Sequence, residues 1–230
     1  MEQLDMDIIA HMRSDFSEKF GIPRQSGLVP PLRSTIVFEP AFRNPDALRG
    51  LEGFSHLWLI WAFHKAEKKT GLWSPTVRPP RLGGNERMGV FATRSPFRPN
   101  GLGLSAVEFV RMEHTAECGT VIHVAGADLM DGTPIYDIKP YLPYADCLPH
   151  ATGSFAATAP EQRLAVAFAE GLAEQLPSDL RDTLAAVLAQ DPRPSYQDDP
   201  MRVYGMDFGR WQVKFQVVDA VLTVVSLRAL

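Results

Sequence analysis

The sequence predicts a mainly β protein in which an antiparallel or mixed barrel is followed by a small α+β domain. Short β-like runs separated by Gly and Pro turns follow one another with little helix between them up to about residue 140. After the last of these runs, the spacing of apolar residues changes to the longer period typical of helices. No GxGxxG motif follows a β-like run, which argues against a doubly wound nucleotide-binding sheet.

The N-terminal part contains several candidate strands. We expect them over residues 6–12, 34–38, 54–64, 89–94, 102–112, 120–129 and 134–138. The run 54–64, FSHLWLIWAFH, is the most apolar and is expected to be a central strand, with a helix as the alternative. Residues 40–51 should form a turn with at most a short helix, since Pro40 and Pro45 interrupt them.

The chain is expected to divide into residues 1–149, a barrel domain, and residues 160–230, a small α+β domain, joined by a linker over 150–159. The linker segment HATGSFAATA is small, polar and without a pattern. Pro160 predicts the start of a helix that reaches about Leu176, and Ser178 predicts a second helix that stops before Pro192. Residues 209–218 and 220–227 then predict a hairpin that turns at Asp219.

Composition and charge indicate a cytoplasmic protein with an uneven charge distribution. No apolar run reaches the roughly 20 residues of a membrane helix, and the acidic N-terminus is unlike a signal peptide. The two cysteines and six histidines form no metal motif, so no metal is expected. The net charge is −4, but residues 24–111 hold 13 Lys/Arg against 6 Asp/Glu, and residues 112–201 hold 4 against 14. This asymmetry favours a phosphate-rich partner on one surface.

The segment 75–105 concentrates the positive charge. Five arginines face a single acidic residue, Glu86, and prolines and a Gly-Gly pair place them on turns. Arginines on turns typically meet anions, so we expect an anionic ligand at this segment. The alternative is a set of solvated arginines on two loops of the barrel.

Five sequence blocks carry a resemblance to a known family. They are IPRQSG (22–27), RGLEGFSHLW (49–58), TVRPPRLGGNERMGVFATRSPFRPNGLGLS (76–105), DLMDGTPIYDIKPYLPYAD (128–146) and DPRPSY (191–196). In this order they resemble the TsaA-like family, whose bacterial members are similar to tRNA methyltransferases. The resemblance implies a single-sheet β-barrel of the class VIII methyltransferase type and a homodimer. It also implies S-adenosylmethionine-dependent methylation of N6 of threonylcarbamoyladenosine at position 37, in the anticodon loop of tRNA.

The resemblance also implies which residues bind the cofactor S-adenosylmethionine. These positions fall on Pro23, Arg24, Gln25, His64, Lys65, Arg94, Leu104, Asp128, Leu129, Met130 and Asp131. Their chemistry suits the cofactor, because arginine can bind its carboxylate, aspartate its ribose hydroxyls and leucine its adenine. Two positions depart from the family pattern, since Lys65 replaces a Gln and Gly101 replaces a Pro.

The target nitrogen must lose a proton, and the candidates for accepting it are Asp137, Tyr141 or a backbone carbonyl near Asp128. An ion pair of Asp137 with Lys139 is the structural alternative for that aspartate. The candidates for contact with tRNA are Arg78, Arg81, Arg87, Arg98, Arg193 and Tyr196. The arginines would bind phosphates, and Arg193 and Tyr196 of DPRPSY could also stack on bases.

Other functions remain open on the sequence alone. The same barrel could methylate another RNA or a small molecule, or could sense the cofactor and bind RNA without catalysis. A phosphate-ester hydrolase is the weakest alternative, because the histidines form no ligand motif.

Overall fold

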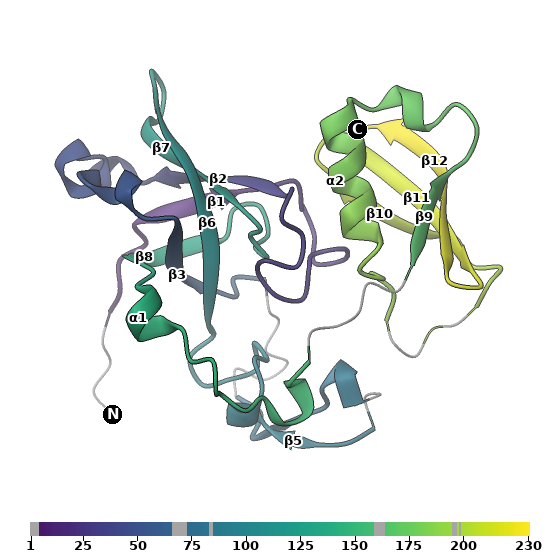
Figure 1. Ribbon diagram of the computed structural model, residues 1–230, viewed down its shortest axis with the longest axis horizontal. Coiled ribbons are helices and arrows are strands. Elements are labelled where there is room, and N and C mark those ends of the chain that lie inside the picture. Colours follow the sequence, from purple (N-terminus) through teal and green to yellow (C-terminus); the bar gives the residue numbers. More distant parts are fainter. Residues whose placement is uncertain (1–4, 66–72, 83–84, 159–163, 195–196, 198) are drawn as a thin grey trace.

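The computed structural model describes residues 5–65, 73–82, 85–158, 164–194, 197 and 199–230. Two β-sheets lie side by side, and a small two-stranded sheet projects below the larger one (Figure 1). The predicted mainly β class is confirmed.

Six strands of the N-terminal part form one sheet that closes into a barrel in the order β1-β2-β7-β6-β3-β8. Every neighbouring pair is antiparallel. The strands are β1 (Ala10–Arg13), β2 (Arg33–Phe38), β3 (His56–Ala62), β6 (Leu102–Thr115), β7 (Gly119–Ala125) and β8 (Pro134–Pro140). Closure leaves no free edge in this sheet, which protects its backbone hydrogen-bonding groups from other chains.

The barrel interior is filled by alternate residues of its strands. In β3, Leu57, Leu59 and Trp61 are buried while the residues between them are more exposed. Because successive side chains of a strand point to opposite faces, this alternation fixes the register of β3. The run 54–64 is therefore a central strand, as predicted, and the helix alternative is wrong.

Short one-turn helices connect the barrel strands. Between β2 and β3 the chain forms η1 (Pro40–Phe42), η2 (Pro45–Leu48) and η3 (Leu51–Gly53), as the prolines predicted. The 4-residue helix α1 (Pro143–Asp146) follows β8. The chain then runs below the barrel toward the small sheet and forms η6 (Ser154–Ala156) (Figure 1).

The small sheet pairs β4 (Thr76–Val77) with β5 (Met88–Gly89). Flanking it are η4 (Pro80–Leu82) and η5 (Val90–Ala92). The strand expected over 89–94 is therefore wrong beyond Gly89. The backbone N–H and the hydroxyl of Thr93 both donate to the Val90 carbonyl, at 3.1 and 2.8 Å, and close a tight turn instead.

The C-terminal part is a four-stranded sheet in the order β10-β11-β12-β9 with one 11-residue helix against it. Its elements are β9 (Ala165–Phe168), η7 (Ala173–Gln175), α2 (Ser178–Leu188), β10 (Tyr204–Phe208), β11 (Trp211–Val218) and β12 (Val221–Ala229). The second predicted helix and the hairpin at Asp219 are confirmed. The strand β10 was not predicted.

The helix expected over 160–176 is wrong. Residues 159–163 lie outside the described part, and Ala165–Phe168 pairs in parallel with β12 as a strand. The physical reason is a period of two, since the large side chains of Leu164, Val166 and Phe168 alternate with exposed alanines. The helix prediction rested on Pro160 as a helix start and on the apolar residues that follow it.

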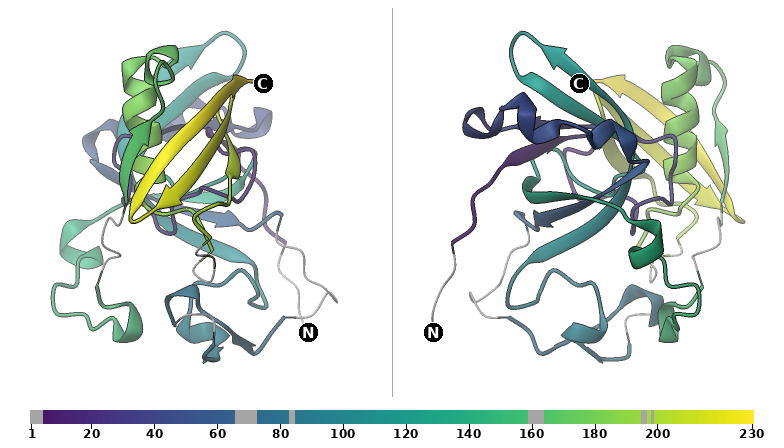
Figure 2. Two further views of the ribbon diagram at one scale, coloured as in Figure 1. Left: turned by 90° about the vertical axis from the view of Figure 1, so that its right-hand side faces the viewer. Right: turned by 60° about the vertical axis from the view of Figure 1, so that its left-hand side comes forward.

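The loop after β1, residues 14–32, packs the two parts of the chain against each other. The rings of Phe16 and Phe208 meet edge to face with centroids 5.6 Å apart, and Phe20 stacks on Phe215 at 6.4 Å. The Gly209 N–H donates to the Asp15 carbonyl at 2.8 Å. This loop lies between the barrel and the second sheet in two views (Figures 1 and 2), so the C-terminal part supports a segment of the N-terminal part.

Candidate active site

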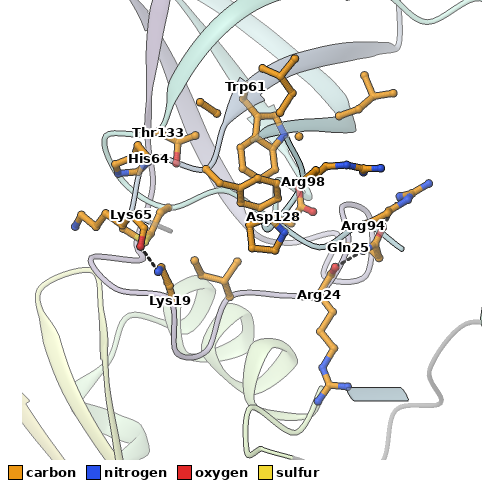
Figure 3. Close-up of a pocket in the computed structure, with 18 of the residues that line it drawn as sticks. Lys19, Arg24, Gln25, Trp61, His64, Lys65, Arg94, Arg98, Asp128 and Thr133 are labelled. Carbon is orange, nitrogen blue, oxygen red and sulfur yellow. Dashed lines mark hydrogen bonds between the residues drawn. The ribbon is translucent and has the colours of Figure 1, made fainter. Parts of the chain in front are cut away.

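A cavity of about 730 Å³ opens beside the barrel, where β3 ends and β6 begins. Four segments far apart in the sequence line it: the loop 19–25, residues 61–65, the arginine segment 94–98 with 102–104, and residues 128–133 (Figure 3). Antiparallel pairing of Ala62 with Leu102 places the second and third of these side by side. The volume lies in the range of small-molecule sites.

A chain of hydrogen bonds forms the polar part of the cavity wall. The Trp61 Nε1–H donates to Ser105 Oγ at 3.0 Å, and the Ser105 hydroxyl donates to Asp128 Oδ1 at 2.6 Å. Trp61 and Ser105 are both buried. The indole therefore fixes the serine hydroxyl, and the serine in turn fixes the carboxyl group that faces the cavity.

Burial raises the pKa of Asp128 above its ordinary value. The hydrogen bond from Ser105 and the positive charge of Arg94 oppose this shift without cancelling it. A buried carboxylate is a strong acceptor for hydroxyl groups of a ligand.

Gly103 allows Trp61 to lie flat against the neighbouring strand. The two residues are directly opposed in the β3–β6 pair. A Cβ at position 103 would overlap the indole ring, so only glycine fits there without displacing it. Phe63 packs edge-on against the same ring, with centroids 4.4 Å apart. These aromatic groups form an apolar wall beside Asp128.

Basic and amide side chains line the mouth of the cavity. Arg94 donates from Nη1 to the Gln25 side-chain oxygen, which connects the arginine segment to the loop after β1. Lys19 donates to the Lys65 carbonyl, and Lys65 Nζ donates to the Ser17 carbonyl at 3.3 Å. The two bonds between Lys65 and the loop after β1 hold that loop against the end of β3.

Desolvation, reinforced by the positive charge of Lys65, lowers the pKa of His64. The imidazole is therefore neutral near pH 7 and adds no charge to the mouth of the cavity.

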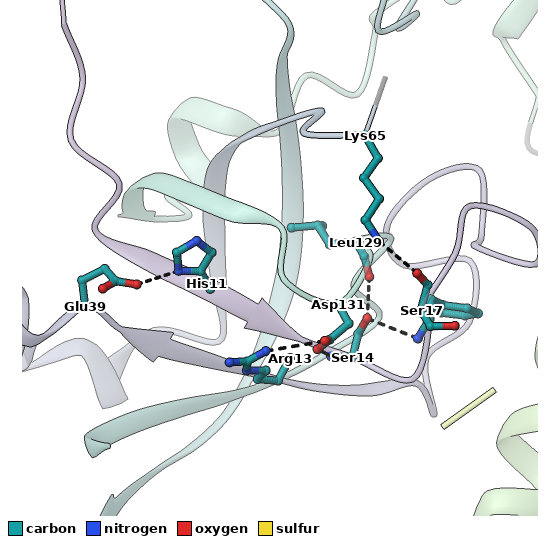
Figure 4. Close-up of polar contacts among 9 residues, drawn as sticks. His11, Arg13, Ser14, Ser17, Glu39, Lys65, Leu129 and Asp131 are labelled. Atoms are coloured by element: carbon teal, nitrogen blue, oxygen red, sulfur yellow. Dashed lines mark hydrogen bonds and ion pairs between the residues drawn. The ribbon is translucent and has the colours of Figure 1, made fainter. Parts of the chain in front are cut away.

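Nine of the eleven predicted cofactor residues line the cavity together. They are Pro23, Arg24, Gln25, His64, Lys65, Arg94, Leu104, Asp128 and Met130. The structure does not bring the other two, Leu129 and Asp131, to its wall. Leu129 lies in the barrel core, and its carbonyl accepts from Ser14 Oγ at 2.8 Å. Asp131 accepts from the Ser14 N–H at 3.2 Å and pairs with Arg13 at 3.5 Å (Figure 4).

The two side chains predicted as candidate proton acceptors lie elsewhere on the barrel. Neither Asp137 nor Tyr141 is among the described residues that line the cavity. Asp137 pairs with Lys139 at 2.7 Å, which is the structural alternative raised from the sequence. Tyr141 packs on Trp58, with ring centroids 5.6 Å apart.

The predicted tRNA-contact arginines fall into two groups. Arg78 and Arg87 are exposed on the small sheet and its loop, and Arg98 lies at the cavity wall. Arg193 differs, because its side chain is only 12% exposed and donates to Asp191 through Nε at 2.9 Å and Nη2 at 3.0 Å. Arg81 lies in η4, and Tyr196 lies outside the described residues.

Sequence reasoning missed several residues of this site. Trp61, Ser105, Phe97, Lys19 and Thr133 had no assigned role, yet four of them line the cavity and Ser105 bonds to Asp128. A signal for Trp61 existed, since an aromatic residue on a central strand opposite a glycine indicates close packing. The partner of Ser105 is 23 residues away and had no local signal.

Two further findings concern metals and membranes. Across the described ranges, no group of three or more His, Cys, Asp or Glu side chains is arranged to hold a metal ion. The described helices include none that is long and apolar enough to span a membrane.

Comparison with known proteins identifies the family. Residues 11–147 match the tRNA-methyltransferase O (TrmO) N-terminal domain, and residues 161–230 match the TrmO C-terminal domain. The chain belongs to the tRNA-methyltransferase O family. The predicted family and the predicted tRNA methyltransferase activity are thereby confirmed.

The TrmO relatives include named enzymes and solved structures. An Escherichia coli tRNA (adenine(37)-N6)-methyltransferase is 42% identical over 99% of each chain. A protein of the same name from Eikenella corrodens is 48% identical over 76% of this chain and 98% of its own. A crystal structure of TrmO from Pseudomonas aeruginosa, 34% identical, covers 99% of both chains with a TM-score of 0.79.

Proposed function

We propose that the protein transfers a methyl group from S-adenosylmethionine to N6 of threonylcarbamoyladenosine at position 37 of tRNA in the cytoplasm. The observation that carries the proposal is the cavity in which Asp128, fixed by Ser105 and Trp61, lies below a mouth lined by arginines. The E. coli and E. corrodens TrmO relatives, named tRNA (adenine(37)-N6)-methyltransferases, support the same target position.

The residues of the cavity fit S-adenosylmethionine. Its volume of about 730 Å³ suits a ligand of this size. Asp128 offers an anionic acceptor for the ribose hydroxyls, and Leu104, Phe63 and Met130 offer apolar surface for the adenine. Arg94, joined to Gln25, offers a cation for the carboxylate of the methionine part.

The chain's contribution to the reaction is positioning. When bound, S-adenosylmethionine supplies a methyl group already activated by a positively charged sulfur. The cavity residues orient this group, and the loop after β1, held by Lys19 and Lys65, excludes water on one side. Aligning two reactants in this way removes up to about 7–11 kcal/mol of barrier.

The proton of the target nitrogen needs an acceptor near the cavity. Asp137 is paired with Lys139 and Tyr141 packs on Trp58, so neither has a cavity position that supports this role. Our proposal therefore keeps the third candidate of the sequence analysis, a backbone carbonyl near Asp128.

For tRNA, we propose that Arg78, Arg87 and Arg98 contact phosphates beside the cavity, with Arg81 on the same loop. These contacts add affinity that depends on salt but not on sequence. The buried pairing of Arg193 with Asp191 favours a structural role for that arginine.

We further propose a division into a class VIII barrel domain (1–149), a linker (150–159) and a C-terminal domain (160–230), assembled as a homodimer. The separate family matches to 11–147 and 161–230 support this division. The shared packing around Phe16 implies that the two domains do not move independently.

The test is methyl transfer to defined tRNA. Purified protein is incubated with labelled S-adenosylmethionine and tRNA from a strain that lacks the activity, and the nucleosides are identified by mass spectrometry. Parallel reactions use threonylcarbamoylated tRNA and unmodified transcript. We expect a methyl group on threonylcarbamoyladenosine only. Transfer to neither RNA by a protein that still binds the cofactor would overturn the tRNA assignment, and Arg94→Ala should abolish transfer by weakening cofactor binding.

A further inference from the structure

Two aromatic side chains outside the cavity lie stacked on each other in solvent. Trp73 is 43% exposed and Phe91 is 71% exposed, and their ring centroids are 6.1 Å apart at an interplanar angle of 24°. Exposing two large aromatic rings to water is unfavourable, because each would bury a large apolar area in a core. A paired, exposed arrangement of this kind therefore points to an interaction site.

Backbone contacts place this aromatic pair beside the cavity. Trp73 precedes β4 and Phe91 follows β5, and the β4–β5 pairing of Thr76 with Gly89 brings both to the same end of the small sheet. The Ser74 N–H donates to the Phe97 carbonyl at 3.1 Å, and Phe97 lines the cavity. The Val90 N–H donates to the Pro75 carbonyl at 3.0 Å, which fixes the spacing of the two aromatic segments.

Exposed cations lie on the same small sheet. Arg78 follows β4 and Arg87 precedes β5, at the end of this short ladder opposite to Trp73 and Phe91. Arg87 Nη1 donates to Thr76 Oγ1 at 3.1 Å, which holds one guanidinium on the sheet. Aromatic planes among cations are the combination that binds single-stranded RNA, where bases stack on the rings and phosphates meet the arginines.

We propose that Trp73 and Phe91 form a stacking platform for unpaired nucleobases of the RNA strand that flanks the target adenosine. The inference rests on the proposed function, and it assigns a recognition role to residues outside the cofactor cavity. The platform requires unstacked bases, so it selects a single-stranded loop over a duplex. Arg78 and Arg87 bind the backbone of the same strand and fix its direction.

The first experiment uses an anticodon stem-loop that carries threonylcarbamoyladenosine and 2-aminopurine at a neighbouring loop position. Fluorescence anisotropy measures binding of this RNA, and the emission intensity of 2-aminopurine measures stacking. We expect the wild-type protein to quench the 2-aminopurine, because stacking on an aromatic ring quenches its emission. Trp73→Ala and Phe91→Ala should each weaken binding by about tenfold, the scale of one base–aromatic stack. KM for the RNA should rise in proportion, while kcat at saturating RNA stays unchanged.

Conservative variants separate stacking from apolar contact. Trp73→Phe and Phe91→Tyr keep an aromatic plane and should bind RNA nearly as the wild type does, whereas Phe91→Leu keeps apolar area only and should not. Phe42→Ala removes a 38% exposed aromatic side chain from η1, remote from the cavity, and serves as the matched control. Circular dichroism and cofactor binding by calorimetry establish that each variant is folded.

The outcomes distinguish this inference from the proposed function. Wild-type protein that transfers no methyl group to tRNA contradicts the function itself. Active wild-type protein with Trp73→Ala and Phe91→Ala variants of unchanged KM contradicts the platform alone. Full binding by Phe91→Leu, or conversion of an oligomer to a monomer by Trp73→Ala, also contradicts it, since the pair would then be an apolar protein interface.

Discussion

Asp128 is the side chain on which the cavity's polar contacts converge. It accepts from Ser105, feels the charge of Arg94 and is buried enough to have a raised pKa. Its neighbours therefore hold it in place at the wall of the cavity. A ligand hydroxyl can donate to the same carboxyl group, and this makes Asp128 the most informative single position for the cofactor proposal.

Asp128→Asn should weaken S-adenosylmethionine binding by about tenfold to a hundredfold, because a hydrogen bond to a charged group is worth about 1.5–3 kcal/mol. The ionised carboxyl is the stronger acceptor for the ribose hydroxyls of the proposed cofactor, so wild-type affinity should fall as the pH drops through the raised pKa. Because this pKa is raised, the loss of affinity should begin at a higher pH than it would for an ordinary aspartate. Asp128→Asn has no carboxyl group to titrate at this position and should lack this pH dependence. Calorimetry across pH tests both effects, and Asp182→Asn, a change of a 70% exposed side chain, is the control.

Asp15 gives a second prediction, on stability. Burial, with a smaller effect of the nearby Asp131 charge, raises its pKa. Between the ordinary and the raised pKa the folded state binds more protons than the unfolded state, so stability falls as the pH rises through this window. Asp15→Asn should therefore increase Tm at pH 7, and its advantage should shrink toward pH 4. A thermal-unfolding series that shows the same difference at both pH values would contradict this account.

At the scale of elements, the β3–β6 pair determines the shape of the cavity. Trp61 on β3 lies over Gly103 on β6, and Trp61 also fixes Ser105, two residues further along β6. The packing of the Trp61 indole thus depends on the absence of a side chain at position 103. This dependence gives a test in which no charged group is changed.

Gly103→Ala should displace the Trp61 indole and break its bond to Ser105. Overpacking of this kind costs about 1–3 kcal/mol, and cofactor affinity should fall because Asp128 loses its fixed donor. Gly53→Ala adds the same methyl group where no atom lies within 4 Å and serves as the control. Denaturant unfolding and calorimetry measure the two effects. Gly103→Ala with wild-type cofactor affinity would show that the indole does not position Ser105.

The elements differ in how well the sequence predicts them. β3 was predictable as a short, continuous apolar run rich in aromatic residues. The hairpin at Asp219 was predictable because the large apolar residues of β11 alternate with polar ones and a turn follows them. β9 was not, because it has only four residues, two of them alanines, so its period of two is a weak signal without the pairing with β12. The pattern of a short sequence indicates only its local conformational preference. The structure of a short element therefore depends on the segments, far along the chain, with which it pairs.

The same distinction applies to the site. The resemblance led to Pro23, Arg94 and Asp128, which the fold brings to one cavity. It could not separate Asp128 from Asp131, since the carboxyl groups three residues apart bond to Ser105 and Ser14 respectively. Which carboxyl faces the cavity depends on the path of the chain after β7.

At the scale of the whole molecule, the loop after β1 belongs to both parts. Its Phe16 and Phe20 pack into the C-terminal core, while its residues 19–25 form one wall of the cavity. A Cβ at Gly21 would overlap the Met206 side chain, so the loop also approaches the second sheet closely. The C-terminal part therefore supports one wall of the cavity although it supplies no described residue to that wall.

Phe208→Ala should reveal this coupling. Removing the ring that contacts Phe16 costs about 3–5 kcal/mol of stability and leaves the loop after β1 without part of its support, so S-adenosylmethionine affinity should also fall. Leu222→Ala is the matched variant, because Leu222 is fully buried in the same core on β12, whereas the ring that meets Phe16 lies on β10. It should lose about 2–5 kcal/mol with little change in affinity. Both are compared by denaturant unfolding and by calorimetry at a temperature where each is folded. Equal losses of affinity would mean that general destabilisation, and not the contact with the loop, weakens the site.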